Sequence, residues 1–129
     1  MTFQYSTTVR NAKLDAVESS IGVSALLRVF SGAEPANCAA ADPAGLLCTI
    51  NLPVDWMAAA SAGVKVLSGS WTGNASAAGI AASWRIYDST GTTCHIQGNA
   101  TTDMSFVNTN IAVGQTVTVT SFQLTSGNS

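Results

Sequence analysis

The chain has 129 residues, of which 47% are hydrophobic and only 9% charged. This length suits a single domain, 1–129, whose charge-poor surface is weakly protected against association. The five basic residues are scattered and the net charge is −2, which excludes the basic patch of a nucleic-acid-binding protein. The apolar runs are too short for a membrane helix, and the N-terminus lacks a secretory signal pattern. We therefore expect a non-secreted protein that lives in an assembly, without a nucleic-acid or membrane partner.

The first element in the chain is a predicted helix over residues 6–21. Ser6 or Thr7 can cap its start, and Gly22 can end it in the left-handed conformation. On a helical wheel, one broad apolar arc lies opposite a polar side. The arc contains Val9, Ala12, Leu14, Ala16, Val17 and Ile21, and the polar side contains Asn11, Asp15 and Glu18.

The charges of this helix run against its macrodipole, because Arg10 and Lys13 lie early and Glu18 lies late. Such charges either bind a partner outside the chain or form a solvated face. The wide apolar arc and the charge-poor composition lead us to expect an intermolecular contact through residues 1–21. The candidate interface residues are Phe3, Tyr5, Arg10, Lys13, Asp15 and Glu18.

Short strands separated by turns rich in Gly, Pro, Asn and Ser follow the helix. We expect strands at 25–30, 46–52, 64–71, 82–88, 93–97, 104–107 and 115–125, loops at 33–45 and 72–79, and a short helical turn at 56–62. This order predicts a mainly β fold, an antiparallel β-sandwich or a partly closed barrel with one N-terminal α-helix. The helical segment is 1–22 and the β domain 23–129.

Two consecutive strands form a predicted hairpin that organises the β domain, with Gly91 in its turn. Strict alternation indicates which side chains share a face. Trp84, Ile86, Cys94 and Ile96 are expected in the core, and Arg85, Tyr87, His95 and Gln97 outside it.

The last strand has a break in its alternation, because Val117 and Val119 have one parity and Phe122 and Leu124 the other. A β-bulge near 120–121 would bring both pairs to one face. The alternative is a strand buried on both sides, its halves facing different neighbours. We favour the bulge.

The sequence contains few residues that suggest a reaction. Asp88 and Asp103 flank the hairpin as turn residues, and His95 is the only imidazole. Because Cys94 and His95 alternate in one strand, they are not expected to share a metal. The chain has no nucleophile, phosphate-loop or metal-ligand motif. We expect no catalytic residue, no cofactor and no metal.

The cysteines and tryptophans each allow two interpretations. Cys38, Cys48 and Cys94 are expected as reduced thiols, and a bridge between Cys38 and Cys48 is the alternative. The tryptophans are expected in the core, and a sugar-binding face is the alternative. They are Trp56, Trp71 and Trp84.

A resemblance adds a functional expectation. YSTTVRNAKLDAVESSIG, LRVFSG, EPANCAAAD, LPVDWMAAASAG, SWTG, WRIYDSTGTTCHIQG and GQTVTVTSFQLT follow one another from residue 5 to about residue 125. This pattern resembles small proteins encoded in the structural-gene modules of tailed phages and prophages. The resemblance implies a non-enzymatic virion component made in the bacterial cytoplasm, and it transfers no ligand or active-site residue.

Within this class we favour a capsid decoration protein, which would bind the major capsid protein and further copies of itself. A neck, collar or tail-associated protein is the first alternative. A carbohydrate-binding module for host attachment, which would use exposed Trp or Tyr side chains, is the second.

Overall fold

The computed structural model describes residues 3–126 and confirms a mainly β fold with one helix near the N-terminus. Its sheets are antiparallel, and none of them closes into a barrel within the described residues, so the fold is sandwich-like. The elements are α1 (Thr7–Ile21), β1 (Leu26–Phe30), β2 (Leu46–Asn51), β3 (Val64–Val66), β4 (Thr72–Asn74), β5 (Gly79–Ile80), β6 (Ser83–Tyr87), β7 (Cys94–Asn99), β8 (Ser105–Phe106), β9 (Asn110–Ile111), β10 (Thr116–Ser121) and β11 (Gln123–Thr125).

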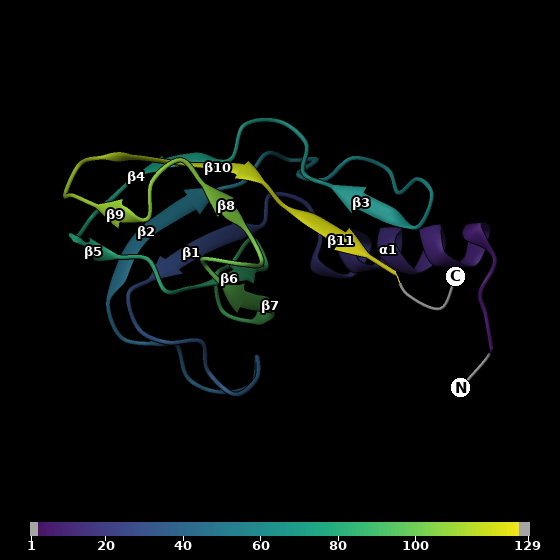
Figure 1. Cartoon of the computed structure of the whole chain (residues 1–129), viewed down its shortest axis with the longest axis horizontal. Coiled ribbons are helices and arrows are strands. Elements are labelled where there is room, and N and C mark those ends of the chain that lie inside the picture. Colours follow the sequence, from purple (N-terminus) through teal and green to yellow (C-terminus); the bar gives the residue numbers. More distant parts are fainter. Residues whose placement is uncertain (1–2, 127–129) are drawn as a thin grey trace.

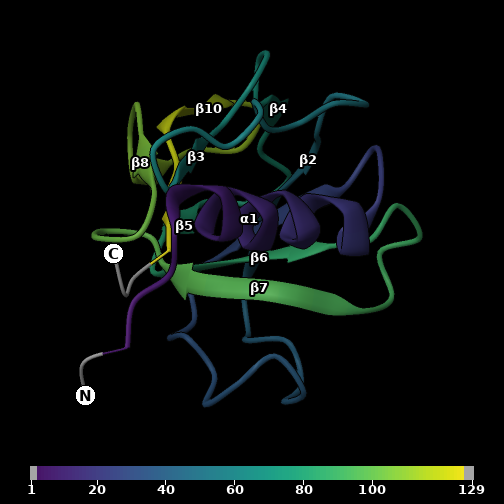
Figure 2. The same ribbon diagram turned by 90° about the vertical axis from the view of Figure 1, so that its right-hand side faces the viewer.

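The strands form one larger sheet and three small ones (Figure 1). The larger sheet has the order β2-β1-β6-β7, and the others are β4-β10-β8, β11-β3 and β5-β9. One hydrophobic core takes side chains from α1, the larger sheet and β10. In Figure 2, α1 lies across the view above β6 and β7.

The helix begins and ends where the sequence predicts. The Ser6 hydroxyl accepts a hydrogen bond from the Val9 amide at 3.2 Å, and Gly22 ends the helix with φ of 95°. The predicted apolar arc does not pack as one face, however. Leu14 and Ile21 are buried, whereas Val9, Ala12 and Ala16 are exposed.

The predicted helical turn at 56–62 is wrong. This segment is extended and forms isolated bridges to the segment around β3, between Met57 and Leu67 and between Ser61 and Val64. Ala62 and Gly63 both have positive φ, 53° and 74°, and reverse the chain between residues 56–61 and β3. The strand expected at 64–71 is also shorter, because β3 ends at Val66.

The region expected as a loop over 72–79 contains β4 and the start of β5. β9 (Asn110–Ile111) is a third strand that the sequence pattern does not predict. Each of these strands has three residues or fewer, so none shows a measurable alternation.

The predicted hairpin is β6 and β7, and Trp84 and Ile86 are buried in the core as expected. A register shift follows Ile86, because Ile86 pairs with Ile96 but Tyr87 pairs with Cys94. This bulge moves Cys94 to the face of Tyr87, so its predicted place beside Ile96 in the core is wrong. Ile96 itself packs against the core.

The predicted exposure of Arg85 and Tyr87 is wrong, although the predicted face is right. Both side chains are only 2% exposed. The loop 31–45 covers this face of the sheet and lies below it in Figures 1 and 2. Gln97 is half-buried, because its amide donates to the Pro35 carbonyl at 2.7 Å. His95 is exposed, as predicted.

The β-bulge predicted in the last strand is confirmed. The register of β10 against β8 shifts between Val119 and Ser121. Val117, Val119 and Phe122 consequently lie in one core, and Leu124 packs against it. The strand has different partners on the two sides of the bulge. β10 pairs with β4 and β8, whereas β11 pairs with β3.

Candidate interaction surface on the N-terminal helix

Three of the six candidate interface residues form an exposed cluster at the start of the helix. The rings of Phe3 and Tyr5 meet edge to face with centroids 5.4 Å apart. The Lys13 ammonium lies 4.2 Å from the centre of the Tyr5 ring, in a cation–π contact. Phe3 is 47% exposed, so this cluster presents aromatic surface to solvent.

The other three candidates point toward the chain itself. Lys65 on β3 is only 2% exposed, and its ammonium lies 2.7 Å from Asp15 Oδ1 and 3.0 Å from Glu18 Oε1. Arg10 lies against Gly63 and donates to the Thr7 hydroxyl at 3.2 Å. The partners of these charges are therefore intramolecular.

Electrostatics strengthens the contact between helix and strand. The hydrogen bond from Lys65, helped by the Ala60 amide, lowers the pKa of Asp15. Burial works to lower the pKa of Lys65, but its hydrogen bonds with Asp15 and Glu18 outweigh this effect and raise the pKa. Both residues are thus held in their charged forms.

The same polar side of the helix also binds backbone amides of the hairpin before β3. Asn11 accepts from the Gly63 amide at 2.9 Å, and Asp15 from the Ala60 amide at 3.0 Å. Glu18 accepts from the Met57 amide at 3.2 Å. Helix side chains thereby satisfy amides that a neighbouring strand would otherwise bind.

This attachment decides which side of the helix remains free. Because the polar side faces β3, the exposed apolar residues Val9, Ala12 and Ala16 face solvent. The sequence predicted this apolar arc but not which way it faces in the fold. The missed signal is Lys65, a lysine between two valines, which matches two carboxylates three residues apart on the helix.

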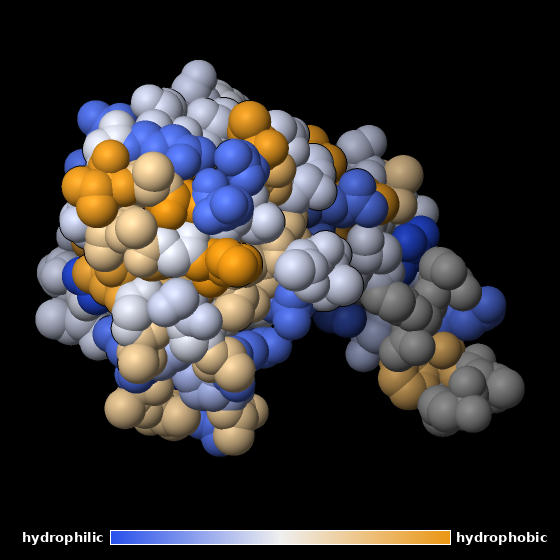
Figure 3. Space-filling model, turned by 60° about the vertical axis from the view of Figure 1, so that its left-hand side comes forward, coloured by the Kyte–Doolittle hydropathy of each residue, from blue (hydrophilic) through white to orange (hydrophobic). Residues whose placement is uncertain are grey.

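Other exposed aliphatic side chains lie elsewhere on the molecule. Ile80, Val107 and Val113 are each about two-thirds exposed, 66%, 67% and 69%, at the end that carries β5 and β9. Figure 3 shows that this side of the molecule carries separate apolar patches among polar ones. Such scattered residues are normal on a soluble surface.

A second set of polar contacts attaches the loop 31–45 to the larger sheet. These contacts lie on the face of that sheet opposite to the core residues Trp84 and Ile86. The Arg85 guanidinium donates to the carbonyls of Asn37 and Ala40 at 3.1 and 3.0 Å, to Asp42 at 3.0 Å and to Gln97 at 3.0 Å. The Tyr87 hydroxyl also donates to Asp42. Burial, followed by the hydrogen bond to Asp42, raises the pKa of Tyr87 to about 12.

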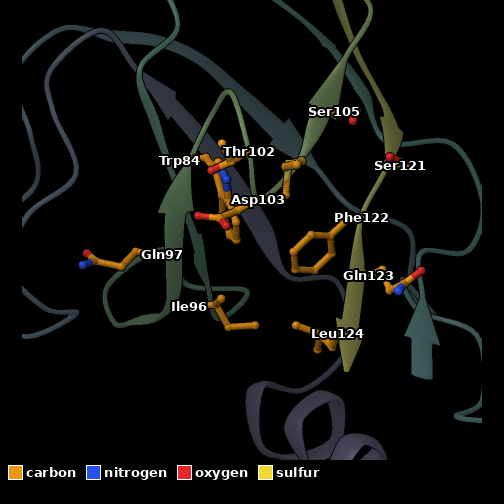
Figure 4. Close-up of a pocket in the computed structure, with 11 residues that line it drawn as sticks. Trp84, Ile96, Gln97, Thr102, Asp103, Ser105, Ser121, Phe122, Gln123 and Leu124 are labelled. Carbon is orange, nitrogen blue, oxygen red and sulfur yellow. The ribbon is translucent and has the colours of Figure 1, made fainter. Parts of the chain in front are cut away.

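A cleft of about 490 Å³ lies between β7 and β11 (Figure 4). Ile96, Phe122 and Leu124 point into it, whereas Gln97 and Gln123 point away. Asp103, at its rim, accepts a hydrogen bond from the Asn99 amide at 2.8 Å. The polar groups therefore do not converge on one point, as the groups of a binding site would.

The carboxylates beside the hairpin serve the turns. Asp88 accepts hydrogen bonds from the Thr90 amide and hydroxyl at 3.2 and 2.6 Å, and the bonds with Thr90 lower its pKa. His95 Nε2 lies 4.0 Å from Asp88 Oδ2. Among residues 3–126, no group of three or more His, Cys, Asp or Glu side chains is arranged to hold a metal.

The alternative interpretations of the tryptophans and of a Cys38–Cys48 bridge are wrong. The three tryptophans are at most 1% exposed, and Trp71 and Trp84 pack on Phe122 with centroids 5.6 and 5.2 Å from its ring. Cys38, Cys48 and Cys94 are all free thiols. No helix in the described residues has the length and apolar character needed to cross a membrane.

Comparison with known proteins identifies no relative. No protein-family model, no curated protein and no solved structure matches this chain.

Proposed function

We propose that this chain is a non-enzymatic structural protein of a tailed-phage virion, a capsid decoration protein that binds the shell in many copies. The observation that carries the proposal is the orientation of α1. The helix is attached by its polar side, and it turns Val9, Ala12 and Ala16 outward next to the aromatic pair Phe3 and Tyr5.

This outer face has the composition of an interface centre. Protein interfaces are enriched in aromatic residues at their core and depleted in charge. Lys13 is the one charged side chain among these outward residues, and it already stacks on Tyr5. Small alanine side chains also allow another backbone to approach closely. A shell protein packing here would bury apolar surface without desolvating an ion pair.

The charge-poor composition supports the same proposal. Only 9% of the residues are charged, and the ion pairs Lys65–Asp15 and Arg85–Asp42 join segments within the fold. Few charges therefore remain to keep copies apart in solution. A protein held in a fixed array on a particle does not need that protection. The carbohydrate-binding alternative lacks its exposed tryptophans.

The test uses tagged chain produced in bacteria infected by the phage that encodes it. Particles are purified on a density gradient, and heads and tails are separated and probed for the tag. We expect the chain on heads, in many copies. Its absence from all particles would contradict a virion role, and its presence only on tails or necks would contradict the decoration role.

Two matched variants test the face. Val9→Asp places a charge on the outer face, and Val113→Asp places the same charge at the β5–β9 end; the two valines are 42% and 69% exposed. We expect Val9→Asp to reduce the bound amount by about tenfold or more, since a buried unpaired charge costs over 1.4 kcal/mol. Val113→Asp should bind as wild type does. Equal loss in both variants would contradict the assigned face.

A further inference from the structure

Two cysteines from distant parts of the chain meet on the covered face of the larger sheet. The bulge in β7 places Cys94 opposite Tyr87, on the face that carries Arg85. Cys38 lies in the loop 31–45, which covers that face. Both cysteines line one open hollow of about 610 Å³.

Hydrogen bonds fix the backbone on both sides of Cys38. The Asn37 side chain accepts from the amides of Ala39 and Ala40 at 2.9 and 3.1 Å, which makes a tight turn around Cys38. Arg85 then holds the carbonyls of Asn37 and Ala40 at 3.1 and 3.0 Å. The turn is therefore held over the sheet beside Cys94, and both cysteines border the same hollow.

The third cysteine has a different environment. Cys48 is fully buried in β2, opposite Val29 of the core, and its thiol points to the Asn74 carbonyl at 3.5 Å. Burial also raises the pKa of the Cys48 thiol, which keeps it protonated. Cys48 is thus removed both from Cys38 and from oxidants in solvent.

We propose that Cys38 and Cys94 form an intramolecular disulfide when the chain meets a mild disulfide oxidant such as glutathione disulfide. The bond would tie the loop 31–45 to β7. It would add a covalent link to a loop whose contacts with the sheet include the side chains of Arg85, Tyr87 and Gln97.

The reaction balances as two thiol–disulfide exchanges. The Cys38 thiolate attacks one sulfur of glutathione disulfide, a mixed disulfide forms, and one glutathione leaves as its thiolate. Cys94 then loses its proton to water and attacks the Cys38 sulfur, and the second glutathione leaves. The two cysteines give up two electrons and two protons, and the oxidant becomes two molecules of glutathione.

The surroundings of Cys94 favour this order. Burial first, and then the hydrogen bond and charge of Cys38, raise the pKa of Cys94 to about 12, while the charge of Arg85 lowers it. Cys94 is therefore protonated at neutral pH and enters the reaction second. Once Cys38 is in the mixed disulfide, its raising effects on the pKa of Cys94 disappear, whereas burial still raises that pKa and the charge of Arg85 still lowers it.

The proposal does not rest on the virion role, because purified chain alone tests it. The virion role would set only the timing of the reaction. Particles leave a reducing cytosol for an oxidising medium when the cell lyses, so the bond would form after assembly.

The experiment oxidises the full-length chain with glutathione disulfide and maps its peptides by mass spectrometry. We expect a Cys38–Cys94 peptide pair in a monomer, with the free thiols falling from three to one. Linking positions so distant in sequence should raise the melting temperature by roughly 10 °C. A Cys38–Cys48 pair, intermolecular dimers alone, or glutathione adducts without a crosslink would overturn the proposal.

Variants provide the controls. Cys38→Ser and Cys94→Ser should each lose the thermal gain on oxidation, and the remaining partner should carry a glutathione adduct. Cys48→Ala should still form the crosslink, whatever its effect on stability. The wild-type peptide map decides the pairing even if one of these variants folds poorly.

Discussion

Two buried cations, Lys65 and Arg85, attach the helix α1 and the loop 31–45 to the rest of the fold in different ways. Lys65 binds α1 through the carboxylates of Asp15 and Glu18. Arg85 binds the loop 31–45 chiefly through uncharged groups, since three of its four hydrogen bonds go to two carbonyls and a side-chain amide. The helix is therefore held by charge and the loop by directed hydrogen bonds.

The difference follows from what each segment can offer. A helix uses its carbonyls internally and presents only side chains, so a lysine point charge suits its two carboxylates. A loop leaves its carbonyls free, and the planar fork of arginine can bind several of them at once. Acid and mutation should consequently affect the two attachments unequally.

The largest effect is expected for Arg85→Ala. The change removes four hydrogen bonds and a buried side chain, and should lower the free energy of unfolding by about 4 kcal/mol. Urea denaturation measures this loss, and cleavage by endoproteinase Asp-N before Asp42, which Arg85 binds, reports release of the loop.

Arg28→Ala is the matched control for that change. The Arg28 side chain donates to the Gly91 carbonyl at 3.2 Å and stacks over Tyr87 at 4.6 Å. The change should cost about 1 kcal/mol and should not increase cleavage before Asp42. Equal destabilisation by the two variants would show that Arg85 does not hold the loop.

Lys65→Ala should have the next largest effect, a loss of about 2 kcal/mol in the free energy of unfolding. The loss is smaller than that for Arg85 because Asp15, whose side chain is 48% exposed, can return to water. Hydrogen exchange of the Trp56 indole N–H, which donates to the Gly22 carbonyl at 2.9 Å, reports the helix end. Lys13→Ala, an exposed lysine of the same helix, should change stability by less than about 0.5 kcal/mol.

Gly63→Ala should weaken the helix contact by about 1–2 kcal/mol. The residue has φ of 74°, and an added Cβ would overlap the Arg10 guanidinium, which must then move. Gly114→Ala is the matched variant, since Gly114 has φ of 79° but no atom near an added Cβ. The difference between the two losses measures the Arg10 contact, and a difference of zero would exclude its contribution.

Acid should loosen the helix before the loop. The pKa of Asp15 is lowered in the folded chain from an ordinary 3.8, so its stabilising effect is complete above about pH 4 and is lost as the pH falls further. Hydrogen exchange at the Ala60 and Gly63 amides, which bind helix side chains, should accelerate there. Asp15→Asn should flatten this dependence, and simultaneous loosening of the loop would contradict the comparison.

The sequence predicted the elements whose signals are local. The cap at Ser6, the end at Gly22, the alternation of Trp84 and Ile86, and the broken parity before Phe122 each depend on a few neighbouring residues. Periodicity and turn chemistry decide such features without knowledge of the rest of the chain.

The predictions that were wrong depend on contacts with residues far away in the sequence. Arg85 and Tyr87 are on the predicted face, but a loop more than forty residues earlier in the chain covers that face. The polar side of the helix faces inward because Lys65, in a strand some fifty residues later, binds it. An alternation pattern shows which residues share a face, but not what covers that face.

The proposed virion role requires that the inward attachment of α1 leave its outer face free to bind a particle. A cryo-EM map of the assembled virion tests it most directly. The account predicts density for the chain on the head, with Val9, Ala12 and Ala16 packed against the shell and the β5–β9 end in solvent. Density with Ile80 and Val113 against the shell and the helix facing solvent would contradict it.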